Sequence, residues 1–148
     1  RRKMLIHASA AAWGSEAVLF RGPAGAGKSD LVLRLIGRGW QLVADDQVML
    51  EGWAVSAPSA LHGMLEIRGL GIFTSLPVAE NARLRLVVDL AARTDVSRLP
   101  EPAFWQCPAG AVPRITLHAF EDSVCDKVIY ALGAATGRLS QKAGAFAA

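Results

Sequence analysis

The chain carries Gly22-Pro23-Ala24-Gly25-Ala26-Gly27-Lys28-Ser29, an octet that matches the phosphate-binding pattern Gly-x-x-x-x-Gly-Lys-[Ser/Thr]. Glycines at this spacing let backbone N–H groups curve around a polyphosphate without clashing Cβ atoms. The helix that follows points its positive dipole end at the same anion. Lys28 is then expected to reach the β- and γ-phosphates, and the Ser29 hydroxyl to bind the magnesium that bridges them. The octet therefore predicts a P-loop whose eight residues bind a nucleotide.

The residues on both sides of the octet support this prediction. Residues 17–20 form a short apolar run of strand length, and apolar residues recur at helical spacing from residue 31 until Gly37 and Gly39 end the helix. Strand, loop and helix follow one another in the order that a P-loop requires. The alternative, a glycine-rich turn with a surface lysine, does not explain this context.

The size and composition of the chain indicate one folded domain. A chain of 148 residues, 52% of them hydrophobic, can bury a core but has little room for a second one. We therefore expect a single domain over residues 1–148. The tail from about residue 133 is poor in large apolar side chains, so we expect it to be loosely held.

Charge, hydropathy and cysteine content argue against several other classes of protein. The net charge is +3, and no basic run is interleaved with aromatic residues, which disfavours a nucleic-acid partner. Every apolar run is interrupted before it could cross a bilayer, and residues 1–3 precede too few apolar residues for a secretory signal. Cys107 and Cys125 lack the spacing of metal ligands, so we expect reduced thiols in a cytoplasmic protein.

Carboxylates follow two predicted strands. Residues 40–44 predict a strand that ends in Asp45 and Asp46, one helix beyond the octet, where P-loop proteins handle magnesium or the attacking group. Neighbouring side chains on an extended chain point to opposite faces, so only one aspartate is expected to face the phosphates, and Asp45 is a candidate metal ligand. Asp89, near the end of a predicted strand over residues 84–90, is a second candidate for the magnesium role. Two solvated turn aspartates are the plain alternative.

Three further polar residues are candidates for the same pocket. His7 follows the first predicted strand, about one hairpin length before the octet, although such a histidine can equally serve as a structural hydrogen-bonding group. Glu66 and Arg68 alternate with Leu65 and Ile67, which places the two charges on one face. They could bind metal and phosphate, or they could pair with each other on a surface.

The sequence pattern in the second half of the chain predicts structural elements and no further site residues from the residues alone. Residues 94–113 contain four prolines and predict an exposed loop. Apolar residues from 120 to 132 recur at helical spacing, with Glu121 and Asp122 in the first turn, where the helix dipole favours acids. Cys125 lies beside this apolar stripe, so we expect it to pack in the core and not to react.

Three blocks of sequence occur in the order typical of one known family. They are residues 22–30, residues 39–46 (Gly-Trp-Gln-Leu-Val-Ala-Asp-Asp) and residues 65–72 (Leu-Glu-Ile-Arg-Gly-Leu-Gly-Ile). On these blocks, which span roughly the first half of the chain, the sequence resembles the catalytic domain of bacterial HPr kinase/phosphorylase. The resemblance implies an α/β fold of the P-loop kinase type, with a mainly β core, a P-loop helix and a C-terminal helix.

The same resemblance implies an ATP- and magnesium-dependent protein-serine kinase. Its substrate would be a serine of HPr, the small phosphocarrier of the phosphotransferase system, and in that family the same site can also run phosphorolysis. By this match, Ser29 and Glu66 correspond to magnesium ligands, and Asp46 corresponds to the aspartate that takes the proton from the substrate serine.

Three more residues gain a role by the same match. Lys28 corresponds to the phosphate-binding lysine of the family, and His7 to the histidine ahead of the loop. Arg98, in the stretch Ser97-Arg98-Leu99, corresponds to a catalytic arginine. The family assembles as hexamers, so the resemblance also implies a homo-oligomer.

The chain departs from the family pattern in two places. Longer members carry an additional N-terminal domain, so the chain resembles the short form that lacks it or an excised catalytic core. After its Ile-Thr strand the family has Pro-Val-Arg-Pro-Gly-Arg-Asn, a stretch associated with dephosphorylation, where this chain has His-Ala-Phe-Glu-Asp-Ser-Val at residues 118–124. We therefore expect kinase activity to exceed phosphorylase activity.

Two other functions stay open at the level of sequence. A P-loop kinase of a small metabolite would use Asp89, and not Asp46, beside the phosphates. A nucleotide-sensing module would bind ATP and switch a partner protein without catalysis. No feature of the sequence indicates a nucleic-acid or membrane partner.

Overall fold

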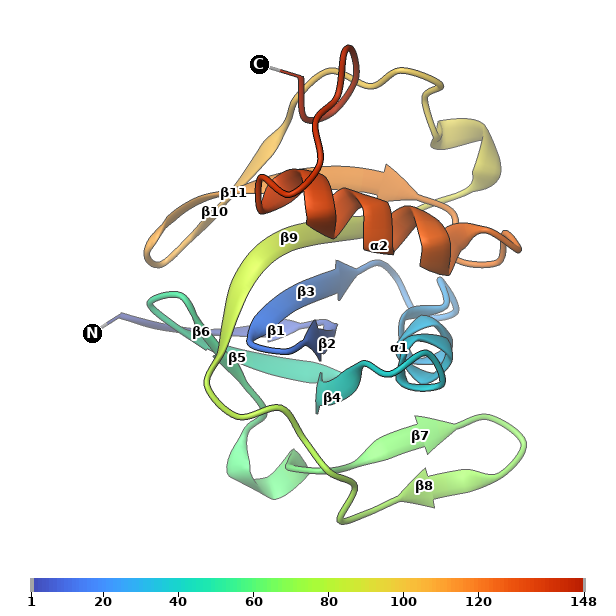
Figure 1. Ribbon diagram of the computed structural model, residues 1–148. Helices are drawn as coiled ribbons and strands as arrows, with labels where there is room; N and C mark the ends of the chain where they lie inside the picture. The colour runs from blue at the N-terminus through green and yellow to red at the C-terminus, as the bar shows by residue number, and fades with distance from the viewer. Residues whose placement is uncertain (1, 148) are drawn as a thin grey trace.

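Strand β9 (Ala82–Leu90) lies at the centre of the sheet. In the computed structural model, which describes residues 2–147, β9 pairs in parallel with β3 (Glu16–Arg21) and β11 (Gly110–Leu117). Its first residues also pair with β6 (Ala54–Ser56), and Figure 1 shows β9 curving between these neighbours. Apolar side chains of β9 are buried on both faces of the sheet, with Leu86 and Val88 in one core and Val87 in the other.

The main sheet contains nine strands within the described residues. Seven of them follow the order β1-β5-β6-β9-β3-β2-β4, while β11 pairs with β9 and β10 pairs with β11. The remaining strands are β1 (Lys3–His7), β2 (Ser9–Trp13), β4 (Gln41–Ala44), β5 (Gln47–Glu51) and β10 (Phe104–Cys107). The structure therefore confirms the predicted α/β class with a mainly β core.

The β2–β3 hairpin leads directly into the glycine-rich octet. Residues 22–27 form a loop after β3, which we call the glycine loop, and α1 (Lys28–Ile36) begins at its end. Gly37 ends this helix by donating its N–H to the carbonyl of Leu33 at 3.1 Å. The predicted order of strand, loop and helix is confirmed.

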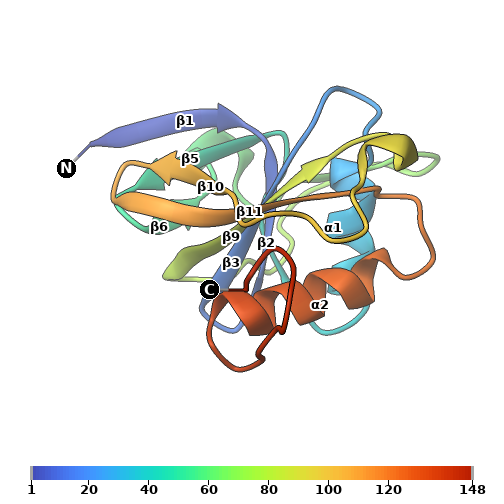
Figure 2. The ribbon, with the colours of Figure 1, turned by 90° about the horizontal axis from the view of Figure 1, so that it is seen from above.

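Two helices cover one face of the sheet, and successive residues of the strands alternate between two cores. The core under α1 and α2 (Val124–Ala135) contains Phe20, Leu31, Leu35, Leu86, Val88, Val128 and Leu132. The core on the opposite face contains Leu19, Val48, Leu50, Val87 and Val112. In Figure 2, α2 lies at the bottom of the view and β1, the strand at one end of the sheet order, lies at the top.

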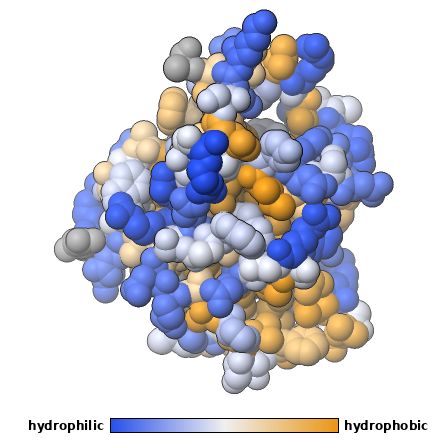
Figure 3. Space-filling view, viewed as in Figure 1, coloured by the Kyte–Doolittle hydropathy of each residue, from blue (hydrophilic) through white to orange (hydrophobic). Residues whose placement is uncertain are grey.

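A separate two-stranded hairpin lies beside α1. Its strands are β7 (Leu65–Ile67) and β8 (Gly71–Phe73), and Leu65 anchors the hairpin in the core under α1. The large side chains of Leu70 and Ile72 are exposed, and Figure 3 shows apolar side chains gathered at the lower right, over this hairpin. The hairpin thus combines a buried anchor with an apolar outer surface.

The remaining regular structure is short. Two single-turn 3-10 helices, η1 (Ser59–Leu61) and η2 (Arg93–Asp95), lie in the connections. No helix within residues 2–147 is long and apolar enough to cross a bilayer. Helix α2 extends to Ala135, beyond the point where we expected a loose tail, and Phe146 packs partly against the core.

The prediction of a loop over residues 94–113 is wrong in its second half, which forms β10 and the start of β11. Alternate residues of β10 turn inward, so Cys107 is buried and the guanidinium of Arg21 lies 5.2 Å from the centre of the Trp105 ring. The prolines mask this alternation in the sequence, although proline is tolerated at turns and on the edges of sheets.

The predicted start of the C-terminal helix at residue 120 is also wrong, because α2 begins at Val124 and its first-turn acid is Asp126. The preceding residues are held by contacts to other elements. Nδ1 of His118 lies 2.9 Å from the Ala91 carbonyl, and Arg34 donates to the carbonyl of Ala119. Tertiary contacts therefore override the helical periodicity that these residues continue.

Cys125 has the packing role that the sequence predicts. Its side chain lies on the buried face of α2, and this burial raises the pKa of the thiol above its ordinary value. A buried thiol with a raised pKa is a poor nucleophile, because little of it is ionised near neutral pH.

The glycine loop yields a matched test of packing. A Cβ atom at Gly27 would lie 2.7 Å from Cβ of Ala119, whereas a Cβ atom at Gly25 would meet nothing within 4 Å. Both residues have left-handed backbone angles, with φ of 100° and 83°, so both alanine variants incur a backbone cost of about 1–2 kcal/mol. We expect Gly27→Ala to lose about 1–3 kcal/mol more of the free energy of unfolding, because it also overpacks the loop. Urea denaturation measures both values, and equal losses would contradict the prediction.

Candidate active site

A cavity of about 390 Å³ opens beside the glycine loop. The loop and the first turn of α1 form one wall, and His7 at the end of β1 and Asp46 in the β4–β5 turn lie on another. The β7–β8 hairpin contributes Glu66 and Arg68, and Phe120 lies before α2. Five separate parts of the chain therefore meet at this cavity.

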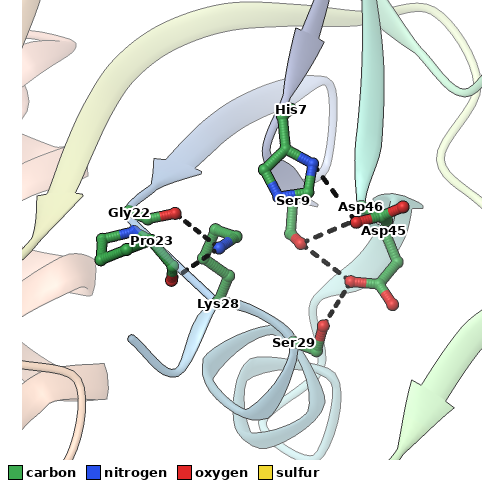
Figure 4. A network of polar contacts seen from close by, with 8 residues as sticks. All are labelled: His7, Ser9, Gly22, Pro23, Lys28, Ser29, Asp45 and Asp46. Atoms are coloured by element: carbon green, nitrogen blue, oxygen red, sulfur yellow. Dashed lines mark hydrogen bonds and ion pairs between the residues drawn. The ribbon is translucent and has the colours of Figure 1, made fainter. Parts of the chain in front are cut away.

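Lys28 is held by the carbonyl groups of its own loop. Its Nζ donates to the oxygen of Gly22 at 2.6 Å and to that of Pro23 at 3.1 Å, and the residue is only 8% exposed (Figure 4). No carboxylate among residues 2–147 forms an ion pair with this ammonium group. A buried cation with only carbonyl partners favours an anion in the adjacent cavity.

Asp45 is the polar centre of the site. Its Oδ1 accepts hydrogen bonds from Oγ of Ser29 at 2.6 Å and from Oγ of Ser9 at 2.8 Å (Figure 4). Its Oδ2 accepts one from the backbone N–H of Glu66 at 3.2 Å. The carboxylate, which is 8% exposed, thus joins α1, β2 and the β7–β8 hairpin.

Asp46 faces different surroundings from Asp45. Its backbone is left-handed, with φ of 73°, and its side chain lines the cavity with 65% of its surface exposed. Oδ1 of Asp46 lies 3.3 Å from Nδ1 of His7. The two aspartates therefore differ in exposure and partners, as their adjacent positions in the sequence predicted.

Glu66 and Arg68 both line the cavity, which is the shared face that their alternation predicted. They form no ion pair with each other among the described residues, so the alternative of a self-contained surface pair does not apply. Both charged groups are available to a ligand.

Asp89, the second candidate carboxylate, lies outside the cavity. Its two oxygens accept hydrogen bonds from Nε of Arg21 at 2.7 Å and Nη2 of Arg21 at 3.0 Å, and Arg114 lies 3.4 Å away. Asp89 alternates with Val88 and Leu90, which belong to the core under the helices, so it points to the opposite face. Its carboxylate serves this arginine cluster.

Arg98 is not brought to the cavity. It is exposed in the segment between η2 and β10, and it is absent from the residues that line the cavity. Its catalytic assignment stays a prediction from the resemblance.

Ser9 and Phe120 are among the cavity residues that the sequence did not predict for the site. Ser9 is fully buried and bonds to Asp45, and its only signal is that it is a polar residue within a run of alanines. Phe120 lines the cavity, but the sequence assigned it to the helical stripe. In both cases the role depends on distant parts of the chain.

The oxygen groups at the site suit a hard cation only in combination with a ligand. No group of three His, Cys, Asp or Glu residues within the described part of the chain could hold a metal by itself. Ser29 and Asp45 do supply a hydroxyl and a carboxylate in contact at the start of α1, and Glu66 lines the same cavity. Mg²⁺ typically takes one or two carboxylates together with waters and phosphate oxygens, so this donor set fits it.

Comparison with known proteins gives concordant results. Residues 3–102 match the family model described as the HPr Serine kinase C-terminal domain. The HPr kinase/phosphorylase of Aromatoleum aromaticum is 45% identical over 101 residues, which cover 56% of this chain and 31% of that protein. The HPr kinase/phosphorylase of Azoarcus sp. is 40% identical over 119 residues, which cover 68% of this chain and 37% of that protein.

A solved structure extends the match over nearly the whole chain. The Hpr(Ser) kinase/phosphatase from Coxiella burnetii superposes with a TM-score of 0.68 and 26% identity, covering 91% of this chain and 96% of that one. The chain spans about a third of the length of the curated relatives it matches. Since the family model covers well over half of the residues, the chain belongs to the HPr serine kinase C-terminal domain family.

Proposed function

We propose that this chain is an ATP- and Mg²⁺-dependent kinase that phosphorylates a serine of an HPr-type phosphocarrier protein. The observation that carries the proposal is one cavity with a buried cation on one side and an exposed carboxylate on the other. Lys28 supplies the cation, and Asp46, in contact with His7, supplies the carboxylate. Family membership and the names of the relatives, HPr kinase/phosphorylase, support the choice of substrate.

The glycine loop and Lys28 would bind the phosphates of the nucleotide. Lys28 would exchange its carbonyl partners, Gly22 and Pro23, for phosphate oxygens, which form stronger charge-assisted hydrogen bonds. The N-terminal amides of α1 would add donors and a positive dipole end. These groups would stabilise charge that spreads over the transferred phosphoryl group.

Ser29, Glu66 and Asp45 would hold Mg²⁺ together with phosphate oxygens. The cation would neutralise charge on the phosphates when it is bound. Ser29 contacts Asp45 directly, so Asp45 can orient that hydroxyl or bind the ion through water. Glu66, on β7, also lines the cavity and would add its carboxylate.

Asp46 would accept the proton of the incoming serine. A serine hydroxyl is a weak nucleophile near neutral pH, and a carboxylate within hydrogen-bond reach can orient it and take its proton. Asp46 is exposed to the cavity, whereas Asp45 is buried and already accepts three hydrogen bonds. His7, 3.3 Å from Asp46, would hold the carboxylate in position.

The predicted preference for the kinase direction rests on residues 118–124, which replace the family stretch associated with dephosphorylation. In this chain the replaced segment packs against the glycine loop: Phe120 lines the cavity, and Ala119 fills the space beside Gly27. The segment contains no arginine that could hold free phosphate. We also propose a cytoplasmic homo-oligomer, hexameric by the resemblance, in which Arg98 would reach a site only by moving or from a neighbouring copy.

The direct test uses labelled ATP, Mg²⁺ and HPr from the same cell, with a variant of HPr whose target serine is alanine as the substrate control. The proposal expects label on the unmodified HPr alone. Binding of ATP without transfer to any HPr-type protein would favour the nucleotide-sensing alternative.

Lys28→Ala tests the phosphate site. Loss of several charge-assisted hydrogen bonds should weaken ATP binding by about 10- to 100-fold. Lys127→Ala is the matched control, since it removes the same charge from a surface pair with Glu121. Equilibrium titration with a fluorescent ATP analogue measures both affinities, and similar values for the two variants would refute the assignment of Lys28.

Asp46→Asn separates the proposed kinase from a metabolite kinase that uses Asp89. We expect Asp46→Asn to lower phosphate transfer at least about a hundredfold while ATP still binds, because the proton acceptor is removed. Asp89→Asn should weaken the arginine cluster and lower the melting temperature but keep transfer near the wild-type rate. Assays well below both melting temperatures compare the variants, and the reverse pattern would support the metabolite kinase.

The direction of the reaction can be measured with one phosphoprotein. Forward transfer from ATP to HPr should be faster than phosphorolysis of phosphoserine-HPr by inorganic phosphate. Parallel initial rates at saturating substrate provide the comparison, and equal efficiency in both directions would defeat this part of the proposal.

A further inference from the structure

Three successive residues at the junction between β1 and β2, His7 to Ser9, contact Asp45 and Asp46. The side chain of His7 contacts the carboxylate of Asp46, and the N–H of Ala8 donates to the carbonyl of Asp46 at 3.1 Å. The hydroxyl of Ser9 then donates to Asp45 at 2.8 Å and accepts the backbone N–H of Asp46 at 3.4 Å (Figure 4). The β4–β5 turn is thus fixed through backbone and side-chain contacts together.

We propose that Ser9 is a positioning residue for the phosphoryl-transfer reaction, acting through Asp45 and Asp46. The inference rests on the proposed function and deepens it, because it assigns a role to a residue at the wall of the cavity that bonds to both aspartates. Ser9 belongs to β2 and is fully buried.

The backbone of Asp46 explains why a positioning residue is needed. A φ of 73° is unfavourable for a residue with a side chain, and such a conformation persists only where its surroundings hold it. Both backbone polar groups of Asp46 are held by the β1–β2 junction, the carbonyl by Ala8 and the N–H by Ser9. The contact at 3.4 Å is long for a hydrogen bond, and the shorter bond from Ser9 to Asp45 at 2.8 Å is the stronger of the two contacts.

The hydrogen bonds to Oδ1 of Asp45 give a second reason why Ser9 is needed as a positioning residue. Ser9 and Ser29 both donate to Oδ1, and Ser29 is the residue expected to turn toward the metal. When the Ser29 hydroxyl leaves, Asp45 still accepts hydrogen bonds from Ser9 and from the N–H of Glu66. Ser9 therefore keeps the carboxylate, and the turn that carries Asp46, in place during the change.

The neighbours of Ser9 show that packing alone does not require a serine. Ala8, Ala10, Ala11 and Ala12 are fully buried like Ser9, and all are apolar. A buried hydroxyl is costly unless it is hydrogen-bonded. Its two partners, both in the aspartate pair, account for the polar residue at this position.

The activity test compares Ser9→Ala with Ala12→Gly. Ala12 is equally buried on β2 but bonds to neither aspartate, so it reports the effect of weakening the strand alone. We expect Ser9→Ala to lower kcat about 10- to 100-fold, because a small misplacement of a reacting group has effects of this size. The KM for ATP should stay nearly unchanged, and Ala12→Gly should keep the wild-type kcat.

A second measurement does not depend on activity. Hydrogen exchange followed by NMR should show the Asp46 amide exchanging at least about tenfold faster in Ser9→Ala than in Ala12→Gly, because its acceptor is lost. An Asp46 amide unaffected by Ser9→Ala, or a kcat equal to that of Ala12→Gly in an active enzyme, would overturn the proposal. A wild-type chain that transfers no phosphate would instead overturn the proposed function, and the exchange result would still decide whether Ser9 holds the turn that carries Asp46.

Discussion

A buried carboxylate sets the geometry of the site. Asp45 is almost inaccessible to water, and a buried charge is tolerated only where hydrogen bonds replace its lost solvation. Its donors come from β2, from α1 and from the β7–β8 hairpin, so three elements that are far apart in the sequence must meet at one residue. The meeting point fixes the start of α1 against the turn that carries Asp46. The hydrogen bonds that stabilise the buried Asp45 carboxylate therefore also set the relative positions of three elements that contribute residues to the cavity.

The sheet explains why two similar carboxylates have different roles. Asp46 lies in the turn after β4. This turn lines the same cavity as the glycine loop and the first turn of α1. Asp89 lies within β9, where side chains alternate between the two faces, and its position in the alternation directs it away from the helices. There it balances the charges of Arg21 and Arg114. An acid at or near the end of an apolar strand is the sequence signal in both cases, and the structure separates the two because Asp46 lies in a turn and Asp89 lies within a strand.

Local signals made the first half of the chain predictable. The octet, its strand and its helix have their own sequence signature, and the alternation around Glu66 correctly placed two charges on one face. The failures have physical causes that are not local. Prolines masked β10, contacts from Ala91 and Arg34 kept residues before Val124 out of α2, and Ser9 gained its role from a turn 36 residues away.

The site divides into a part that must change partners and a part that is already arranged. Lys28 bonds to carbonyls of its own loop and Ser29 bonds to Asp45, so binding of phosphates and metal, as proposed, has to break both sets of contacts. The contacts of Asp46 with His7, Ala8 and Ser9 involve none of these groups. The cost of rearrangement therefore falls on nucleotide binding, where phosphate charge can offset it. Asp46, proposed to accept the proton, needs no rearrangement. The free-energy barrier to phosphoryl transfer therefore includes no cost for moving this carboxylate.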